Sequence, residues 1–224
     1  PIKIDTFSIT NLERPIAAGF ITAQFPLEKL NSSIGGETFS FKDGTADVRL
    51  YCKTDIDNFK FVRPILSGNV VVKNADITYL PRNMKLVNSN LTLNFNQKDL
   101  VISNSRFQLG KSVLNMNCVI QNFLNFYYTD PQKILVNLKL SSPTLSLSEF
   151  MSFLGARKTA KKKPINKNSV NEVANQLAAV LEASKVNIQL NVDRAIYKRF
   201  VANNLNANIS MLGDGIYFNK INIS

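Results

Sequence analysis

The sequence predicts a mainly β protein: a curved, extended antiparallel sheet shaped as a groove or half-pipe, with two or three short helices. First, apolar and polar residues alternate over much of the chain, which is the pattern of strands with one buried face. Second, turn-forming residues separate these runs at intervals of about 10 to 15 residues. Third, these intervals leave little room for the crossover helices that parallel strands require, which favours antiparallel pairing.

The strands follow from this alternation, taken in order along the chain. Leu91, Leu93 and Phe95 alternate with polar residues, and the pattern resumes at Leu100 and Ile102 after a polar break, which predicts a hairpin. Comparable period-two runs lie at 46–52, 114–120, 134–140 and 186–192. The "KDG" at 42–44 is among the predicted turns. Strand boundaries are also predicted at four prolines that fall between runs: Pro64, Pro81, Pro131 and Pro143.

Two helices are predicted, with a weaker helical turn at 122–128. The segment "SLSEFMSFLG" predicts a short helix at 148–154 that ends before Gly155. The segment 169–184 opens with a Ser169-x-x-Glu172 capping box and carries apolar residues at helical spacing. We expect this amphipathic helix to cover one end of the sheet or part of its apolar face.

An internal similarity links residues 87–107 and 201–223. Both are Asn-rich strands with apolar residues two apart, followed by a turn and a second strand. Leu91 corresponds to Leu205 in this alignment. Two copies form a weak repeat, but they indicate an extended architecture built from similar hairpins. Because the sequence starts without Met and stops within a strand pattern, we treat 1–224 as one elongated β-rich fragment of a larger protein.

The net charge of +11 is concentrated in one segment. Six basic residues and no acid lie between 156 and 167, so subtracting six from eleven leaves +5 for the rest of the chain. A solvated flexible linker at 156–168 is the simplest interpretation, and attraction to an anionic membrane surface is the alternative. The residues that would bind such a surface are Arg157, Lys158, Lys161, Lys162 and Lys163. Nucleic-acid binding is disfavoured because the aromatic residues do not interleave with these cations.

The composition argues against catalysis. The chain has no histidine, the commonest general base and metal ligand. Cys52 and Cys118 fit no metal or redox spacing and are expected to be half-buried residues of strands, and the sequence leaves open whether they form a disulfide. Asp55 and Asp57 lack a third carboxylate at a supporting spacing, so we predict no metal site and no cofactor. The 28 asparagines are attributed to compositional bias rather than to a special role.

The main candidate site is the apolar face of the sheet. The predicted helices offer too few apolar residues to cover the strands, which suggests a groove that holds lipid. An ordinary closed core, or a second sheet, would account for the same residues. The groove candidates are Leu91, Leu93, Phe95, Leu100, Ile102, Leu114, Met116, Ile188, Leu190 and Ile209.

The succession of segments resembles the AsmA-like family, relatives of TamB and of elongated lipid-transfer proteins built from repeating β-grooves. The resemblance lies in "GNVVVKNADITYLP" (68–81), the Asn-rich hairpin and Gly110-Lys111-Ser112 step within 86–126, "SSPTLSLSEFMSFLG" (141–155), and a second round to residue 224. The sequence departs from the family pattern at Cys118-Val119, where a glycine often opens the next strand. It also lacks the usual N-terminal membrane anchor.

The resemblance implies a periplasmic segment, anchored to the inner membrane through a part absent from this sequence, in a Gram-negative bacterium such as a member of the Bacteroidota. It implies a non-enzymatic role in phospholipid transport between membranes or in outer-membrane assembly. The expected partners are phospholipid or a membrane surface, and other envelope proteins. The competing hypothesis is a structural module that binds envelope proteins through its sheet edges without lipid.

Replacing the five basic residues of 157–163 with Gln should weaken binding to anionic vesicles at low salt, because each cation near an anionic surface contributes about 1 kcal/mol. Vesicle co-sedimentation measures the effect. Exchanging the four lysines for Arg, which keeps the charge, serves as the control. Unchanged binding by the Gln variant would leave the segment as a linker.

Overall fold

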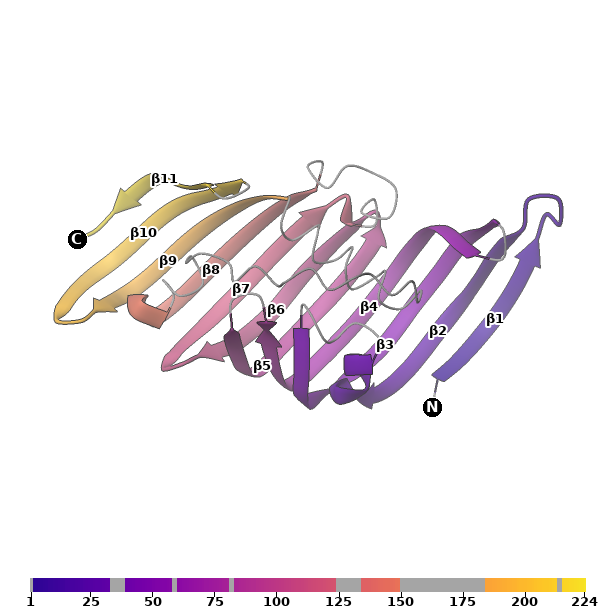
Figure 1. Ribbon diagram of the computed structural model, residues 1–224, viewed down its shortest axis with the longest axis horizontal. Helices are drawn as coiled ribbons and strands as arrows, with labels where there is room; N and C mark the ends of the chain where they lie inside the picture. Colours follow the sequence, from indigo (N-terminus) through magenta and orange to yellow (C-terminus); the bar gives the residue numbers. More distant parts are fainter. Residues whose placement is uncertain are drawn as a thin grey trace, which may run out of the picture.

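The computed structural model describes residues 2–32, 39–57, 60–80, 83–123, 134–149, 184–212 and 215–224, with only the backbone described at 60–63. All eleven strands in these ranges lie in one sheet, in the order of the sequence (Figure 1). The strands are β1 (Ile2–Thr10), β2 (Ile16–Pro26), β3 (Phe39–Asp57), β4 (Lys60–Tyr79), β5 (Met84–Gln97), β6 (Asp99–Leu109), β7 (Ser112–Gln121), β8 (Leu135–Ser146), β9 (Lys185–Tyr197), β10 (Phe200–Leu212) and β11 (Gly215–Asn222), with a 3-10 helix η1 (Leu27–Ser32).

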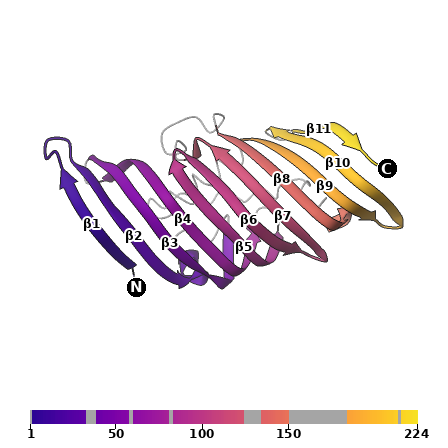
Figure 2. The same ribbon diagram turned by 180° about the vertical axis from the view of Figure 1, so that it is seen from behind.

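The sheet is curved and open, as predicted from the sequence. β1 and β11 lie at opposite ends of an elongated molecule, seen from both sides in Figures 1 and 2. Nine of the ten neighbouring pairs are antiparallel, and β8 with β9 is the one parallel pair. A parallel pair needs a crossover connection, which the chain between Glu149 and Ser184 supplies. The predicted linker 156–168 and helix 169–184 belong to this connection and lie outside the described residues except for Ser184, which is a bend just before β9.

Several strands contain a residue with left-handed backbone, where one extra residue shifts the pairing register. Examples are Asn74 (φ 50°) in β4, Asn88 (φ 51°) in β5 and Asn104 (φ 50°) in β6, each beside a register shift. Such β-bulges reverse the alternation of side chains locally. The sequence pattern matches this reversal, because the inward residues on either side of a bulge are three positions apart instead of two. Examples are Val72 and Ala75 in β4, and Ile102 and Ser105 in β6.

The compositional explanation for asparagine was therefore incomplete. Seven of the ten non-glycine residues with positive φ are Asn. Asn tolerates this conformation because its short polar side chain can hydrogen-bond to nearby backbone. At two of these positions the carbonyl oxygen of the left-handed Asn also accepts a hydrogen bond from the Asn two residues later: Asn90 donates to Asn88 (3.1 Å), and Asn206 donates to Asn204 (3.0 Å).

Three predicted boundaries were wrong, and two of them fall at such bulges. The "KDG" at 42–44 is a bulge within β3, not a turn. Gly44 has φ 106°, and a Cβ there would lie 2.6 Å from the Ala75 Cα. Pro64 and Pro143 lie inside β4 and β8 instead of between strands. Pro64 is beside the register shift between Lys53 and Asp55, where the missing N–H does not interrupt regular pairing.

The repeated hairpins are β5–β6 and β10–β11, which confirms two similar units, but the equivalence differs from the sequence alignment. The matching Asn88–Asn90 and Asn204–Asn206 hydrogen bonds are 116 residues apart. Leu91 is therefore equivalent to Ala207 and not to Leu205. The left-handed residues Asn88 and Asn204 thus give an offset of 116 between the two hairpins, whereas the apolar pattern had matched Leu91 to Leu205, an offset of 114.

Apolar packing on one face forms three clusters along the sheet. The largest joins β6 to β10 around Leu114, Leu145 and Ile188, each at most 1% exposed. A second cluster lies around Leu100 and Ile120, at the ends of the same strands. In the third, Leu27 of η1 packs against Phe41, Ala46, Val72 and Ala75.

η1, which the sequence analysis missed, is fastened to the sheet by one side chain. Asn31 Nδ2 donates to the Phe41 carbonyl oxygen (2.7 Å), and the Phe41 N–H donates to Asn31 Oδ1 (2.9 Å). The amide thus imitates the paired hydrogen bonds of a neighbouring strand. It holds Leu27 over the third cluster, so η1 covers a small part of the apolar face.

Gly110, Lys111 and Ser112 connect β6 to β7. The helical turn that follows β8 contacts these three residues through Glu149. Gly110 has φ 56°, and a side chain there would collide with the Glu149 carboxylate. That carboxylate accepts hydrogen bonds from the Lys111 N–H and the Ser112 hydroxyl, each at 3.2 Å. Residues 147–149 are helical, which confirms the start of the predicted helix within the described residues, and 150–154 lie outside them.

Asn104→Val should destabilise the protein by about 1 to 2 kcal/mol, because a β-branched residue is unfavourable in left-handed backbone. Asn104→Gly should change stability by less than about 0.5 kcal/mol. Asn115→Val is the matched control: this exposed residue in β7 has ordinary strand backbone, and valine has the higher β-propensity. Urea unfolding measures all three, and equal effects of the two Val variants would contradict the bulge assignment.

Candidate functional site

Two rows of apolar residues cross the sheet on one face, each built from residues directly paired between neighbouring strands. The first apolar row contains Ile2, Ala23, Val48, Val70, Leu93, Ile102, Cys118, Leu138, Ile188, Ile209 and Phe218. The second apolar row contains Ile4, Ile21, Leu50, Gly68, Phe95, Leu100, Ile120, Val136, Val186, Met211 and Ile216. Neither row contains a polar side chain in any of the eleven strands.

All ten groove candidates lie on this apolar face. Leu93, Phe95, Leu100, Ile102, Ile188 and Ile209 belong to the two rows, and Leu91, Leu114, Met116 and Leu190 have the same parity in their strands. Five of the ten are buried, namely Leu100, Leu114, Ile188, Leu190 and Ile209. The other five are half-buried. The sequence thus predicted which face these ten residues share, but not that five of them are buried and five half-buried.

Exposure varies along the first apolar row. Ile188 and Ile209 are 1–2% exposed, and Cys118 is 4% exposed. From Ala23 to Ile102 the side chains are half-buried. At the two ends Ile2 is 72% and Phe218 52% exposed. The apolar face is therefore best packed toward β7–β10 and more accessible from β1 to β6.

The opposite face of the sheet is polar. Between the same strands it pairs Asn69 with Asn94 and Asn137 with Asn187, and Asn187 Nδ2 donates to Asn137 Oδ1 (3.1 Å). Lys3, Thr22 and Arg49 continue this face toward β1. Val101 and Val119 form a half-buried apolar pair within it. Only one face of the sheet therefore offers a continuous apolar surface.

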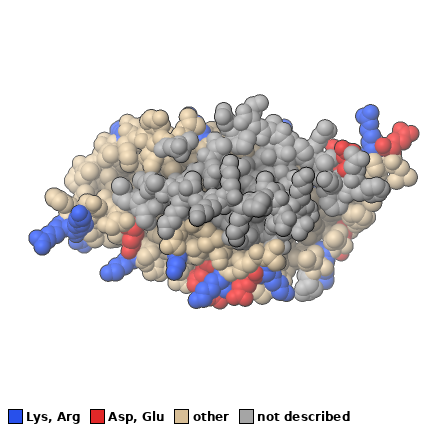
Figure 3. All heavy atoms as spheres, viewed as in Figure 1, with Lys and Arg blue, Asp and Glu red and all other residues tan. Residues whose placement is uncertain are grey.

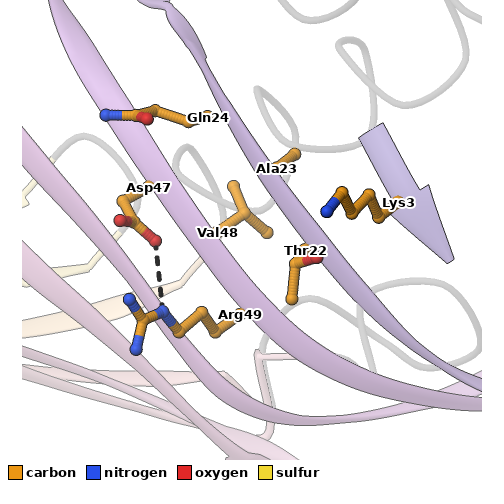
Figure 4. Close-up of a pocket in the computed structure, with 7 residues that line it drawn as sticks. All are labelled: Lys3, Thr22, Ala23, Gln24, Asp47, Val48 and Arg49. Atoms are coloured by element: carbon orange, nitrogen blue, oxygen red, sulfur yellow. Dashed lines mark ion pairs between the residues drawn. The ribbon is translucent and has the colours of Figure 1, made fainter. Parts of the chain in front are cut away.

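Two open depressions occur among the described residues, and the first includes Ala23 and Val48 of the first apolar row. The first is mostly on the polar side of β1–β3, with Lys3, Thr22 and Gln24 beside an exposed Arg49–Asp47 ion pair (3.4 Å; Figure 4). The second is near the β1–β2 turn and includes Glu13, Arg14, Asp55 and Asp57. Exposed ion pairs contribute little stability. In the view of Figure 3, the visible charged side chains lie around the rim and at the ends of the molecule.

Metal and membrane-spanning features are not found in the described part of the chain. No group of three or more His, Cys, Asp or Glu side chains there could hold a metal ion. None of the helices described is long and apolar enough to cross a bilayer. The basic candidates Arg157, Lys158, Lys161, Lys162 and Lys163 lie outside the described residues.

Both cysteines are free thiols that face the apolar side. They lie in β3 and β7, four strand spacings or about 19 Å apart, whereas a disulfide requires Cα atoms within about 7 Å. Burial raises the pKa of the Cys118 thiol to about 12 and also raises the pKa of Cys52. Both cysteines lie in strands, as predicted; Cys52 is half-buried as expected, whereas Cys118 is buried.

Sequence reasoning missed the contribution of β1 and β2 to the apolar rows. Ile2, Ile4, Ile21 and Ala23 do alternate, which is the signal that could have identified them. In β1 the pattern is interrupted, because Thr6 (φ 52°) lies at a register shift and the next inward residue is Phe7.

No protein-family model, curated protein or solved structure matches this chain significantly.

Because the thiolate is the reactive form, a raised pKa slows alkylation at any pH below it. Cys118 should stay unmodified by maleimide at pH 8 in the folded protein, and Cys52 should react more slowly than a thiol in urea-unfolded chain. Mass spectrometry of intact protein measures both, and Cys118→Ala assigns the signals. Equal rates in the folded and unfolded states would contradict the burial of these groups.

Proposed function

We propose that this chain is a segment of a non-enzymatic envelope protein whose sheet shields the acyl chains of phospholipid. In this proposal it serves phospholipid transport between membranes or outer-membrane assembly, in the periplasm, as part of a protein anchored to the inner membrane. The polar headgroup stays in water while the chains lie on the apolar face. The partners are phospholipid, a membrane surface and other envelope proteins.

The observation that carries the proposal is the continuity of the two apolar rows across every strand of one open sheet. All eleven described strands belong to that sheet, so the described residues contain no second sheet that packs against the rows. η1 covers only the cluster around Phe41 and Val72. Such a surface is unfavourable in water and favours an apolar occupant.

The dimensions suit acyl chains. Eleven strands at a spacing of about 4.8 Å give a row about 48 Å long, measured along the sheet. One leaflet of a bilayer is about 15 Å deep in hydrocarbon. A row could therefore hold more than one chain or let a chain slide along it. Burial of each methylene contributes about 0.8 kcal/mol, so contact with one acyl chain offsets much of the cost of leaving a membrane.

Movement along the rows would be passive. Neighbouring positions in a row present similar apolar side chains, so displacement by one strand exchanges one set of contacts for an equivalent set. No bond is made or broken, and the process requires no catalytic group. Direction would come from the membranes at either end of the larger assembly.

A second candidate function is a scaffold that binds envelope proteins through the sheet edges without lipid. The exposed apolar side chains of the edge strands favour it: Ile2 and Phe7 in β1 are 72% and 58% exposed, and Tyr217 in β11 is 57% exposed. Unpaired strand edges bind extended segments of other chains. This function would leave the apolar rows without a ligand.

Mass spectrometry of organic extracts separates the two functions. Chain purified from a Gram-negative host without detergent should contain about one or more phospholipids per molecule. Lipid-free, tightly folded protein that also takes up none from vesicles would contradict the groove and favour the scaffold.

Leu93→Lys should reduce the bound phospholipid at least tenfold, because it places a charge in the middle of the first apolar row. Thr92→Lys is the matched control: the same charge on the neighbouring residue lies on the polar face and should leave lipid binding unchanged. Val48→Lys, at a half-buried position of the same row, repeats the test if Leu93→Lys fails to fold. Equal retention of lipid by the row and control variants would exclude the rows as the site.

A further inference from the structure

Two serine hydroxyls are buried on the apolar face without a hydrogen-bond partner. Ser89 in β5 is 1% exposed and Ser105 in β6 is 4% exposed, and neither Oγ atom has a partner within the described part of the chain. A buried hydroxyl that lacks a partner is destabilising, because it has lost its hydrogen bonds to water. Proteins therefore seldom keep one where an apolar residue would fit.

Other buried serines on this face have partners. The Ser112 hydroxyl donates to the Glu149 carboxylate (3.2 Å) and accepts from the Ser146 N–H (2.9 Å). The Ser142 hydroxyl donates to the Val113 carbonyl oxygen (2.7 Å). Both serines are as deeply buried as Ser89 and Ser105. Burial on this face therefore does not by itself prevent hydrogen bonding.

Packing does not require a hydroxyl at the two unpaired positions. Ser89 and Ser105 are the inward residues directly after the left-handed Asn residues of β5 and β6. The equivalent inward residue in β4 follows Asn74 and is Ala75, which is fully buried and pairs with Ser89. Alanine thus fits a position of this kind, and the hydroxyls need an explanation other than shape.

The bulges beside these serines have partners for their own backbone groups. The Asn74 N–H donates to Asn90 Oδ1 (3.2 Å), and the Asn88 N–H donates to Asp76 Oδ1 (3.1 Å). Both acceptors belong to side chains of the polar face. The polar groups of this region are therefore satisfied on one side of the sheet, whereas the two hydroxyls on the apolar side are not.

The two hydroxyls lie where the three apolar clusters meet. In β6, Ser105 separates Ile102 of the second cluster from Phe107 of the first. In β5, Ser89 precedes Leu91, which packs against the third cluster. β5 and β6 are in the middle of the sheet, so this position does not depend on either end of the chain (Figure 1).

One ligand can contact both hydroxyls. Ser89 lies opposite Phe107, two residues from Ser105, so the two serines are diagonal neighbours about 7 to 8 Å apart. Ser105 pairs with Met116 of β7, which is half-buried and has a flexible, unbranched side chain. From β2 to β6 the first apolar row is half-buried. A ligand on that part of the face reaches the hydroxyls once Met116 adopts another rotamer.

We propose that Ser89 and Ser105 donate hydrogen bonds to the ester carbonyl oxygens of a phospholipid whose acyl chains lie on the apolar rows. This inference rests on the proposed function and adds the class of lipid, one with ester-linked chains. The ester carbonyls are the acceptors that a phospholipid carries next to its apolar chains. They give the hydroxyls the partners that the surrounding apolar side chains cannot provide, while the chains extend over the half-buried part of the first apolar row.

A lipid competition tests the site in the 224-residue chain. The protein is incubated with an excess of vesicles that contain equal amounts of dioleoyl phosphatidylcholine and its diether analogue, which has the same headgroup and chain length but no carbonyl. Mass spectrometry of the bound lipid should show the diester favoured at least about fivefold over the diether, because only the diester satisfies the hydroxyls. Ser89→Ala combined with Ser105→Ala should reduce this ratio to less than about twofold.

Ser184→Ala is the matched control. Ser184 is 3% exposed and its Oγ also lacks a partner among the described residues, but it lies just before β9, three strands from β6. Its substitution should leave the ratio unchanged. Equal binding of both lipids by the unmodified chain, or an unchanged ratio in the double variant, would overturn the ester site and leave the proposed function intact. Binding of neither lipid would contradict the proposed function and the site with it.

Urea unfolding of protein refolded without lipid gives an independent readout. The variant with both Ser89→Ala and Ser105→Ala should have a higher urea midpoint than the unmodified chain, because it lacks two unpaired buried hydroxyls. Ser112→Ala should have a lower midpoint, because it removes the acceptor of the Ser146 N–H. A lower midpoint in the double variant as well would show that the two hydroxyls already have partners in the lipid-free protein, and would overturn the proposal.

Discussion

The structure depends on keeping the two apolar rows on one face of a sheet whose strands are repeatedly interrupted by bulges. A single inserted residue reverses the alternation of a strand. Without compensation, the apolar residues beyond each bulge would therefore point to the opposite, polar face. The chain avoids this by placing a residue that tolerates left-handed backbone, most often Asn, at the insertion and by lengthening the apolar step there from two to three. Small inward residues such as Ala75 and Ser89, at most 1% exposed, follow two of these insertions. The continuity of both apolar rows is the result.

The apolar face is buried to different degrees along the sheet, so its parts contribute differently to stability and to ligand binding. Around Leu114, Leu145 and Ile188 the side chains are almost fully buried, so this part contributes to stability as an ordinary core does. Between β2 and β6 the first apolar row is half-buried. A ligand that lies on the face would gain most of its contacts where the protein has the fewest. This distribution makes the sheet both a folding unit and a candidate acyl-chain surface, without a separate cavity.

The one parallel pair affects the whole molecule, although it joins only β8 and β9. It requires the crossover between Glu149 and Ser184, and it makes β11 run opposite to β1. The polar face is held together by hydrogen bonds instead of apolar packing. Asn side chains on neighbouring strands bond to each other there, as Asn187 does to Asn137.

The sequence by itself determined the local pattern: strands with one apolar face, the hairpin at 90–104, and the face that carries all ten groove candidates. Alternation reports these features because side chains on a strand point to opposite sides whatever the rest of the chain does. Only the tertiary structure decided which strands are neighbours, that Gly44, Pro64 and Pro143 lie within strands, that β8 and β9 are parallel, and that β1 and β2 complete the rows. These features depend on pairing between distant segments, where a left-handed residue such as Thr6 or Asn88 acts as a bulge instead of a turn because a neighbouring strand continues past it.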